Sequence, residues 1–244
     1  VAALACTGLV RAASAHHPTR IVDETWHDPA RARDLPVRVR WPDATTASPP
    51  LPIVLFSHGL GGSVDAGTVW ATAWARAGCV VIHMQHAGSD LPAVRAAATS
   101  ASDLRALRQL ASPAQLVARI RDVVFVLDEI GRRHSGARPG WADIRPTHIG
   151  MSGHSFGALT TMAMAGQRFP GVEPINETRL SAFMPFSASL PTAGDAARAY
   201  AAIHRPLLTI TGTRDDDVIG TGATPERRIA VFAALPPGDK AQLV

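Results

Sequence analysis

The 244-residue sequence is poor in cysteine, in lysine and in aromatic residues. Cys6 and Cys79 are its only cysteines, and Cys79 lies in an apolar run, which favours a core position over a catalytic one. Lys240 is its only lysine, and the arginines are scattered, without a dense block or interleaved aromatics. The net charge of +4 is therefore attributed to solvated faces, and we expect no nucleic-acid partner.

Long hydrophobic runs are also lacking. The apolar stretch at residues 1–10 is too short to span a bilayer, and the sequence does not begin with methionine. Ala13-Ser14-Ala15 then fits an A-x-A cleavage site and is followed by polar residues. We expect residues 1–15 to be the remnant of a secretory signal peptide, and the protein to be secreted or periplasmic. An apolar tail left by the way the fragment was cut is the alternative.

What the sequence has in quantity is apolar residues, at 46%, against 18% charged residues, which is enough for a packed core. Alternating apolar and polar residues at 20–27 and 35–41 predict two antiparallel strands. Further strands are expected at residues 51–56, 80–84, 180–186, 207–211 and from 240, and helices at residues 69–77, 114–130, 158–165, 196–202 and 225–235. This alternation predicts a single α/β domain with a mostly parallel, doubly wound sheet. Residues 91–113 are only weakly periodic and could form a lid.

The chain is organised around Gly153-His154-Ser155-Phe156-Gly157, a Gly-x-Ser-x-Gly pattern. An apolar run precedes it and a small-residue helical run follows it. A strand, a sharp turn and a helix form the context of a nucleophile elbow, which would expose Ser155 above the sheet. A structural glycine turn is the alternative.

A second glycine-rich turn, Ser57-His58-Gly59-Leu60-Gly61-Gly62, follows the strand expected at 51–56. Backbone N–H groups in such a turn can face an anion, and no Gly-Lys-Ser/Thr is present to indicate a phosphate loop. An oxyanion hole needs two such donors, one of them on the residue after the nucleophile. We expect the N–H groups of Leu60 and Phe156 to form it, with His58 supporting the turn.

A serine hydroxyl needs a base, usually a histidine oriented by a carboxylate, and in elbow hydrolases the acid follows the serine and the histidine comes last. Asp215 follows the strand expected at 207–211 and is the predicted acid, with Asp216 as the alternative. A calcium site or a solvated acidic turn would be other uses of this acidic run. No histidine follows Asp215 in the sequence, so we expect the catalytic histidine beyond residue 244.

The sequence also carries histidines that the site does not use. His83 and His86 have H-x-x-H spacing, but a strand does not bring positions i and i+3 to one face, so we expect no zinc site and no cofactor. His154 precedes the nucleophile, and its side chain should point away from that of Ser155.

These motifs together resemble those of the dienelactone-hydrolase-like serine esterases, and within that group of proteins akin to platelet-activating-factor acetylhydrolases. The resemblance rests on residues 56–62, 153–157 and 212–216 and spans about residues 20–244. It implies an α/β-hydrolase fold lacking its last segment, with Ser155 as nucleophile, Asp215 as acid, and Leu60 and Phe156 as oxyanion donors.

The expected function is hydrolysis of a small-molecule or lipid-like carboxylic ester through an acyl-enzyme. An amidase, lipase or polyesterase could use the same machinery. The alternative to an enzyme is a non-catalytic binding protein of the same fold. The absence of a histidine after Asp215 in this sequence would favour that hypothesis.

Overall fold

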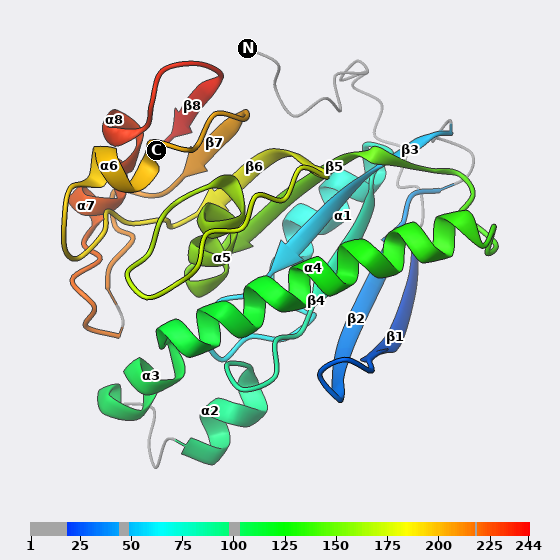
Figure 1. The fold of residues 1–244 in the computed structure, drawn as a ribbon, viewed down its shortest axis with the longest axis horizontal. Helices are drawn as coiled ribbons and strands as arrows, with labels where there is room; N and C mark the ends of the chain where they lie inside the picture. Colours follow the sequence, from blue (N-terminus) through cyan, green and yellow to red (C-terminus); the bar gives the residue numbers. More distant parts are fainter. Residues whose placement is uncertain (1–18, 44–48, 98–102, 218) are drawn as a thin grey trace.

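An eight-stranded sheet with the strand order β1-β2-β4-β3-β5-β6-β7-β8 forms the centre of the molecule (Figure 1). The computed structural model describes residues 19–43, 49–97, 103–217 and 219–244. The strands are β1 (Arg20–Asp28), β2 (Arg33–Trp41), β3 (Leu51–Ser57), β4 (Val80–Met84), β5 (Ile144–His154), β6 (Leu180–Phe186), β7 (Leu207–Ile210) and β8 (Lys240–Leu243). The predicted signal remnant at residues 1–15 lies outside the described residues.

The sheet is antiparallel only at its N-terminal edge. β1 pairs with β2, and β2 with β4, in antiparallel register, while every pairing from β4 to β8 is parallel. The predicted fold class is therefore confirmed. The turn between β1 and β2 covers residues 29–32 and is shorter than the gap between the strands predicted at 20–27 and 35–41. The Asp28 carboxylate accepts hydrogen bonds from the Ala30 N–H and from the Arg31 side chain and so stabilises this tight turn.

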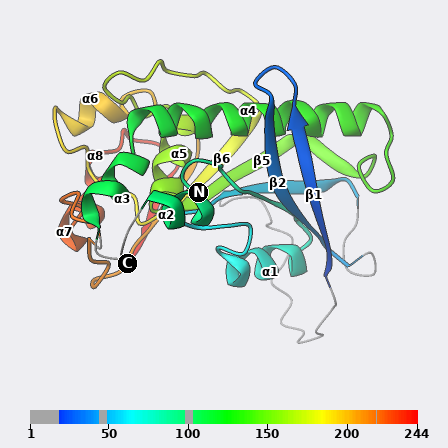
Figure 2. The same cartoon turned by 90° about the horizontal axis from the view of Figure 1, so that it is seen from below.

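Helices cover both faces of the sheet (Figure 2). They are α1 (Thr68–Arg76), α2 (Leu91–Ala97), α3 (Leu104–Leu110), α4 (Pro113–Ser135), α5 (Phe156–Ala165), α6 (Ala196–Tyr200), α7 (Pro225–Ile229) and α8 (Val231–Ala234). α1 packs on one face, and α4 and α5 pack together on the other. No helix in the described part of the chain is both long and apolar enough to cross a membrane.

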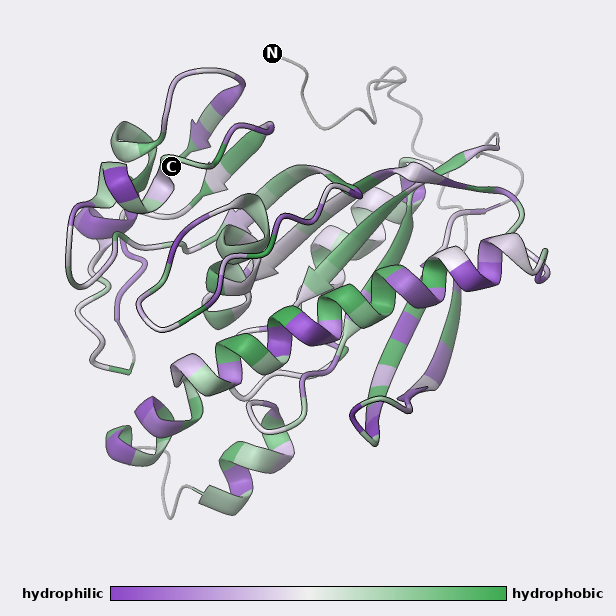
Figure 3. Cartoon of the chain, viewed as in Figure 1, coloured by the Kyte–Doolittle hydropathy of each residue, from purple (hydrophilic) through white to green (hydrophobic). Residues whose placement is uncertain are grey.

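The core is built from the central strands and from one stripe of α4 (Figure 3). Leu116, Ile120, Val123 and Leu127 recur at helical spacing and are buried. α4 continues beyond the predicted end at residue 130, across Gly131. The Glu129 carboxylate binds both Arg132 and Arg133 there, and these pairs offset the low helix propensity of the glycine.

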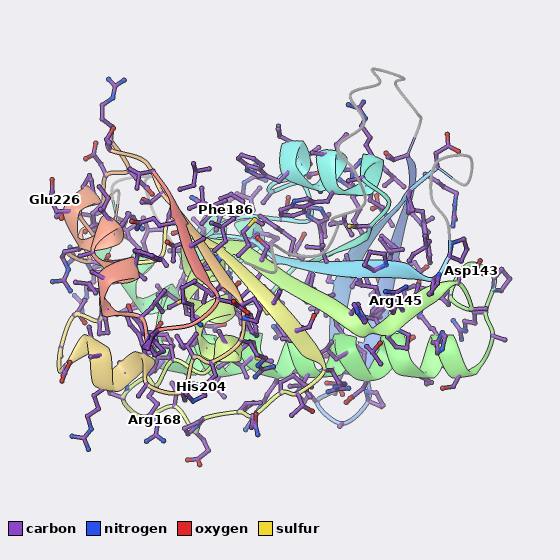
Figure 4. The ribbon with its side chains drawn as sticks, turned by 90° about the horizontal axis from the view of Figure 1, so that it is seen from above. Asp143, Arg145, Arg168, Phe186, His204 and Glu226 are labelled. Carbon is purple, nitrogen blue, oxygen red and sulfur yellow. The ribbon has the colours of Figure 1, made fainter. Side chains whose placement is uncertain are left out.

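Because β3 to β7 are parallel, their carboxyl ends meet at one edge of the sheet. Ser57, His154, Phe186 and Ile210 end their strands there. Figure 4 labels Phe186 at this edge, at the opposite end of the sheet from Asp143 and Arg145. The loops after β3, β5 and β7 are those on which the sequence placed its candidate residues.

Candidate active site

Ser155 lies in a strained turn between β5 and α5. Its backbone has φ 55° and ψ −114°, a left-handed conformation that is costly for a residue with a side chain. The Ser155 N–H donates to the Phe186 carbonyl at 3.0 Å, which ties the turn to the end of the neighbouring strand. This backbone is that of the predicted elbow.

The two glycines of the elbow are required by close packing against the end of β3. A Cβ atom on Gly153 would lie 2.7 Å from the Ser57 carbonyl oxygen, and one on Gly157 would collide with that same oxygen. Any larger residue at either position would push the elbow away from the glycine turn that follows Ser57. The two glycines of the Gly-x-Ser-x-Gly pattern therefore allow the elbow to pack closely against the glycine turn after β3.

The glycine turn after β3 lies directly beside Ser155. A Cβ atom on Gly59 would be 3.4 Å from Cβ of Ser155. The Gly61 N–H donates to the Ser89 carbonyl and the Gly62 N–H to the Gly59 carbonyl. Among the described residues, no protein acceptor takes the N–H of Leu60 or of Phe156, so both are available to a ligand.

The side chain of His58 supports this glycine turn from the protein interior and is 1% exposed. Its Nε2 accepts the His86 backbone N–H at 2.9 Å, so the proton is on Nδ1, which donates to the Gly59 carbonyl at 2.6 Å. Burial, aided by the charges of His86 and Arg119, lowers the pKa of His58 to about 2. A neutral imidazole therefore supports the turn, as expected from the sequence.

Asp215 lies in the loop after β7 and is held by two neighbours. The Thr211 hydroxyl donates to its Oδ2 at 2.8 Å, and Arg228 Nε lies 3.5 Å from its Oδ1. Asp216 is exposed. The Asp217 carboxylate accepts the N–H groups of Ile219, Gly222 and Ala223 and so shapes the loop itself. The three aspartates of the run thus occupy different environments.

His154 makes no hydrogen bond to Ser155 within the described residues. Its pKa is lowered by partial burial and by Arg228, against the opposing effect of the Asp215 charge. The imidazole therefore experiences the field of Asp215, yet it is not placed as a base for Ser155.

The residues predicted as a possible lid lie between the glycine turn and the acid loop. The Leu91 N–H donates to the Gly62 carbonyl, and Val94 of α2 packs on Gly61. Arg108 of α3 donates to the Ile219 carbonyl at 3.1 Å. Leu91 and Leu104 are 37% and 38% exposed. Residues 98–102 of the predicted segment lie outside the described residues.

A second serine–histidine–aspartate set was missed in the sequence. Ser57 Oγ lies 2.9 Å from His86 Nε2, and His86 Nδ1 lies 2.9 Å from Asp122 Oδ2. All three side chains are 0% exposed. Arg33 binds both carboxylate oxygens of Asp122, and Arg31 binds Oδ1.

In this buried set, Asp122 is ionised and His86 is neutral at neutral pH. Burial would raise the pKa of Asp122, but the hydrogen bonds from His86 and Arg33 outweigh it and lower the pKa to about 2. Burial lowers the pKa of His86 to about 4, against the effect of Asp122. The sequence held one signal of this network, because Asp122 falls within the apolar stripe of α4, where a lone carboxylate requires a buried partner.

No protein-family model matches this chain, and no curated protein matches it either. Solved structures do. A cold-adapted esterase from an Arctic intertidal metagenomic library is 15% identical, with 93% of this chain and 83% of that chain covered and a TM-score of 0.57. A dienelactone hydrolase from Anabaena variabilis is 18% identical, with 93% and 85% covered and a TM-score of 0.55. A ferulic acid esterase from Streptomyces cinnamoneus is 19% identical, with 96% and 75% covered and a TM-score of 0.57.

The strand order, the elbow and these neighbours define the class of the molecule: it has the α/β-hydrolase fold. At these identities the likeness concerns the fold. The link to platelet-activating-factor acetylhydrolases stays a prediction.

Proposed function

We propose that this protein is a serine carboxylic-ester hydrolase that acts through an acyl-enzyme on Ser155. The observation that carries the proposal is the Ser155 backbone at φ 55°, beside two N–H groups without a protein acceptor in the described residues. A strained turn of this kind exposes the hydroxyl to a substrate. The esterase and hydrolase names of the structural neighbours agree with this chemistry.

In the proposed mechanism, Ser155 Oγ attacks the ester carbonyl while its proton passes to a histidine, the base expected from the sequence. Asp215 would orient that histidine. The carbonyl oxygen gains negative charge in the transition state and would accept hydrogen bonds from the Leu60 and Phe156 N–H groups. Expulsion of the alcohol leaves the acyl group on Ser155, and water then releases the acid by the same steps.

The proposed substrate is a small-molecule or lipid-like ester. Leu91 and Leu104 support an apolar substrate, since both are partly exposed on the α2–α3 segment between the glycine turn and the acid loop. Secretion or a periplasmic location belongs to the same proposal and rests on the expected signal remnant.

The test uses the full-length protein with p-nitrophenyl acetate, butyrate and octanoate. Ser155→Ala should reduce kcat by a factor on the order of 10⁶, to the background rate. Ser57→Ala is the matched control, because it removes the hydroxyl of the buried serine that is hydrogen-bonded to His86, and it should retain activity within about tenfold. A fluorophosphonate should transfer its phosphonyl group to Ser155 with loss of HF, and the corresponding mass should appear on the Ser155 peptide alone.

Equal rates for wild type and Ser155→Ala would refute the proposal. Hydrolysis of a p-nitroanilide at a comparable rate would indicate an amidase. Tight ester binding by a full-length wild type without turnover would instead establish a binding protein.

A further inference from the structure

Arg119 is a buried cation whose hydrogen bonds all go to neutral groups. It lies on the apolar stripe of α4 and is 0% exposed. Its Nε donates to Ser89 Oγ at 2.8 Å and its Nη1 to the His58 carbonyl at 2.6 Å, while Nη2 lies 3.4 Å from the Gly59 carbonyl. Burial lowers its pKa to about 9, against the effects of the Asp122 and Asp90 charges. Burial of a charge without an ionic partner in direct contact destabilises the folded state, so a functional role for Arg119 is expected.

The guanidinium touches both halves of the proposed oxyanion hole. It stacks on the Phe156 ring, with Cζ 4.2 Å from the ring centroid. Its Nη1 and Nη2 groups reach the carbonyls of His58 and Gly59. Phe156 and Leu60 carry N–H groups for which the described part of the chain supplies no acceptor, so a single side chain contacts one donor residue and the peptide of the other.

The Gly59 carbonyl and the Leu60 N–H belong to the same peptide group. This peptide is trans, since Pro49–Pro50 is the cis bond found among the described residues. In a trans peptide the C=O and N–H vectors point in opposite directions. Hydrogen bonds from His58 Nδ1, from the Gly62 N–H and from Arg119 hold the Gly59 oxygen toward the core, and the Leu60 N–H must then point away from it. A cation at the carbonyl end also polarises the amide and strengthens its N–H as a donor.

We infer that Arg119 is a positioning residue of the oxyanion hole, which orients the Gly59–Leu60 peptide and holds Phe156 against the elbow. The inference rests on the proposed function. Arg119 would not contact the substrate. It would act on the transition state and not on the bound ester, because the carbonyl oxygen of the ester gains negative charge only as the tetrahedral intermediate forms.

The test compares Arg119→Lys and Arg119→Met with wild type and with Arg133→Lys, all in the full-length protein. Arg133 is the matched control: it is on the same helix, 7% exposed and stacked on Trp26 at 4.4 Å, but it binds Glu129 and Glu24. Both Arg119 variants should lose about 10²–10³-fold in kcat with KM within about threefold, as for loss of an oxyanion donor. Arg133→Lys should lower Tm and leave kcat within about twofold.

A transition-state analogue separates positioning from a merely structural role. The inhibition constant of butylboronic acid should rise in the Arg119 variants in proportion to the loss of kcat/KM. Ser89→Ala is the milder variant if neither Arg119 variant folds. This substitution removes the acceptor of the Arg119 Nε hydrogen bond. It should lower kcat about three- to tenfold, with KM unchanged.

Turnover within about threefold of wild type in folded Arg119 variants would overturn the inference. Where these do not fold, turnover within about twofold of wild type in Ser89→Ala would overturn it. A loss confined to KM would do the same. Wild type without turnover would overturn the proposed function and this inference together, whereas wild-type turnover that survives these substitutions overturns the inference alone.

Discussion

Ser57 belongs to a buried serine–histidine–aspartate set, whereas Ser155 lies in a partly exposed turn for which we propose a set of the same residue types. The buried set has the complete hydrogen-bond chain from Ser57 through His86 to Asp122, with no exposed surface. The Ser155 set is incomplete in the described residues, yet it has the strained turn and the available N–H groups. Connectivity among serine, histidine and aspartate therefore does not by itself make a nucleophile, since access and an oxyanion hole are needed as well.

The two aspartates differ in how their charge is used. Asp122 is bound by His86, Arg31 and Arg33, so its lone pairs are occupied and its charge is neutralised within the core. Asp215 accepts a hydrogen bond from Thr211 and has one arginine at 3.5 Å. Asp215 keeps capacity for a further donor, as an acid that orients a catalytic histidine requires.

Asp215→Asn gives the largest effect expected from this comparison. Loss of the carboxylate should reduce kcat by a factor on the order of 10⁴, because the histidine would lose its orientation and the stabilisation of its charged form. Ester hydrolysis by the full-length protein measures this, with a denaturant midpoint to show that the fold persists. Asp216→Asn is the control and should keep its activity. The reverse pattern would transfer the role to Asp216.

Asp122→Asn should act on stability first. It removes the negative charge shared by His86, Arg31 and Arg33 and replaces one acceptor oxygen with an NH2 group, which cannot accept their hydrogen bonds. Loss of one partner from a buried charge network costs about 3–5 kcal/mol. Urea unfolding measures the change in the free energy of unfolding. Asp128→Asn on the same helix is the matched control, since the Asp128 side chain is 64% exposed and should change stability by less than about 1 kcal/mol. A cost for Asp122→Asn as small as this would show that the network is not structural.

The sequence predicted the fold well because the strong signals are local. The strands at residues 80–84 and 180–186 have the predicted bounds, since continuous apolar runs bounded by turns leave little freedom. The segment expected as one helix at 225–235 divides into α7 and α8, with Ala230 between them as the C-cap of α7 and N-cap of α8. Periodicity alone does not register such a break.

The site was only partly predictable, and the reason is distance along the chain. The backbone conformation of Ser155 follows from five adjacent residues. His86, Arg119 and Asp122 instead meet Ser57 and His58 only because β3, β4 and α4 pack together. Their positions on buried elements could be found in the pattern, but their partners could not.

The pH dependence of stability tests the protonation of the buried histidines His58, His83 and His86. Burial lowers the pKa of His83 and His86 to about 4, and that of His58 to about 2. Below pH ~6.5 the histidines of the unfolded chain bind protons, whereas the buried histidines of the folded protein stay neutral until the pH reaches their lowered pKa values. The free energy of unfolding should therefore fall as the pH drops from about 6.5 towards 4, by up to about 1.4 kcal/mol per pH unit for each histidine.

His83→Leu apportions this slope among the three histidines. His83 packs on Phe56 with ring centroids 5.3 Å apart and is not part of the Ser57 set. Its removal should flatten the dependence of the free energy of unfolding on pH by about one histidine's contribution, ~1.4 kcal/mol per pH unit. Urea titrations between pH 7.5 and 4.5 measure both slopes. Loss of the entire slope in this variant would mean that His58 and His86 are not held neutral, and the fixed charges assigned to the buried set would then be wrong.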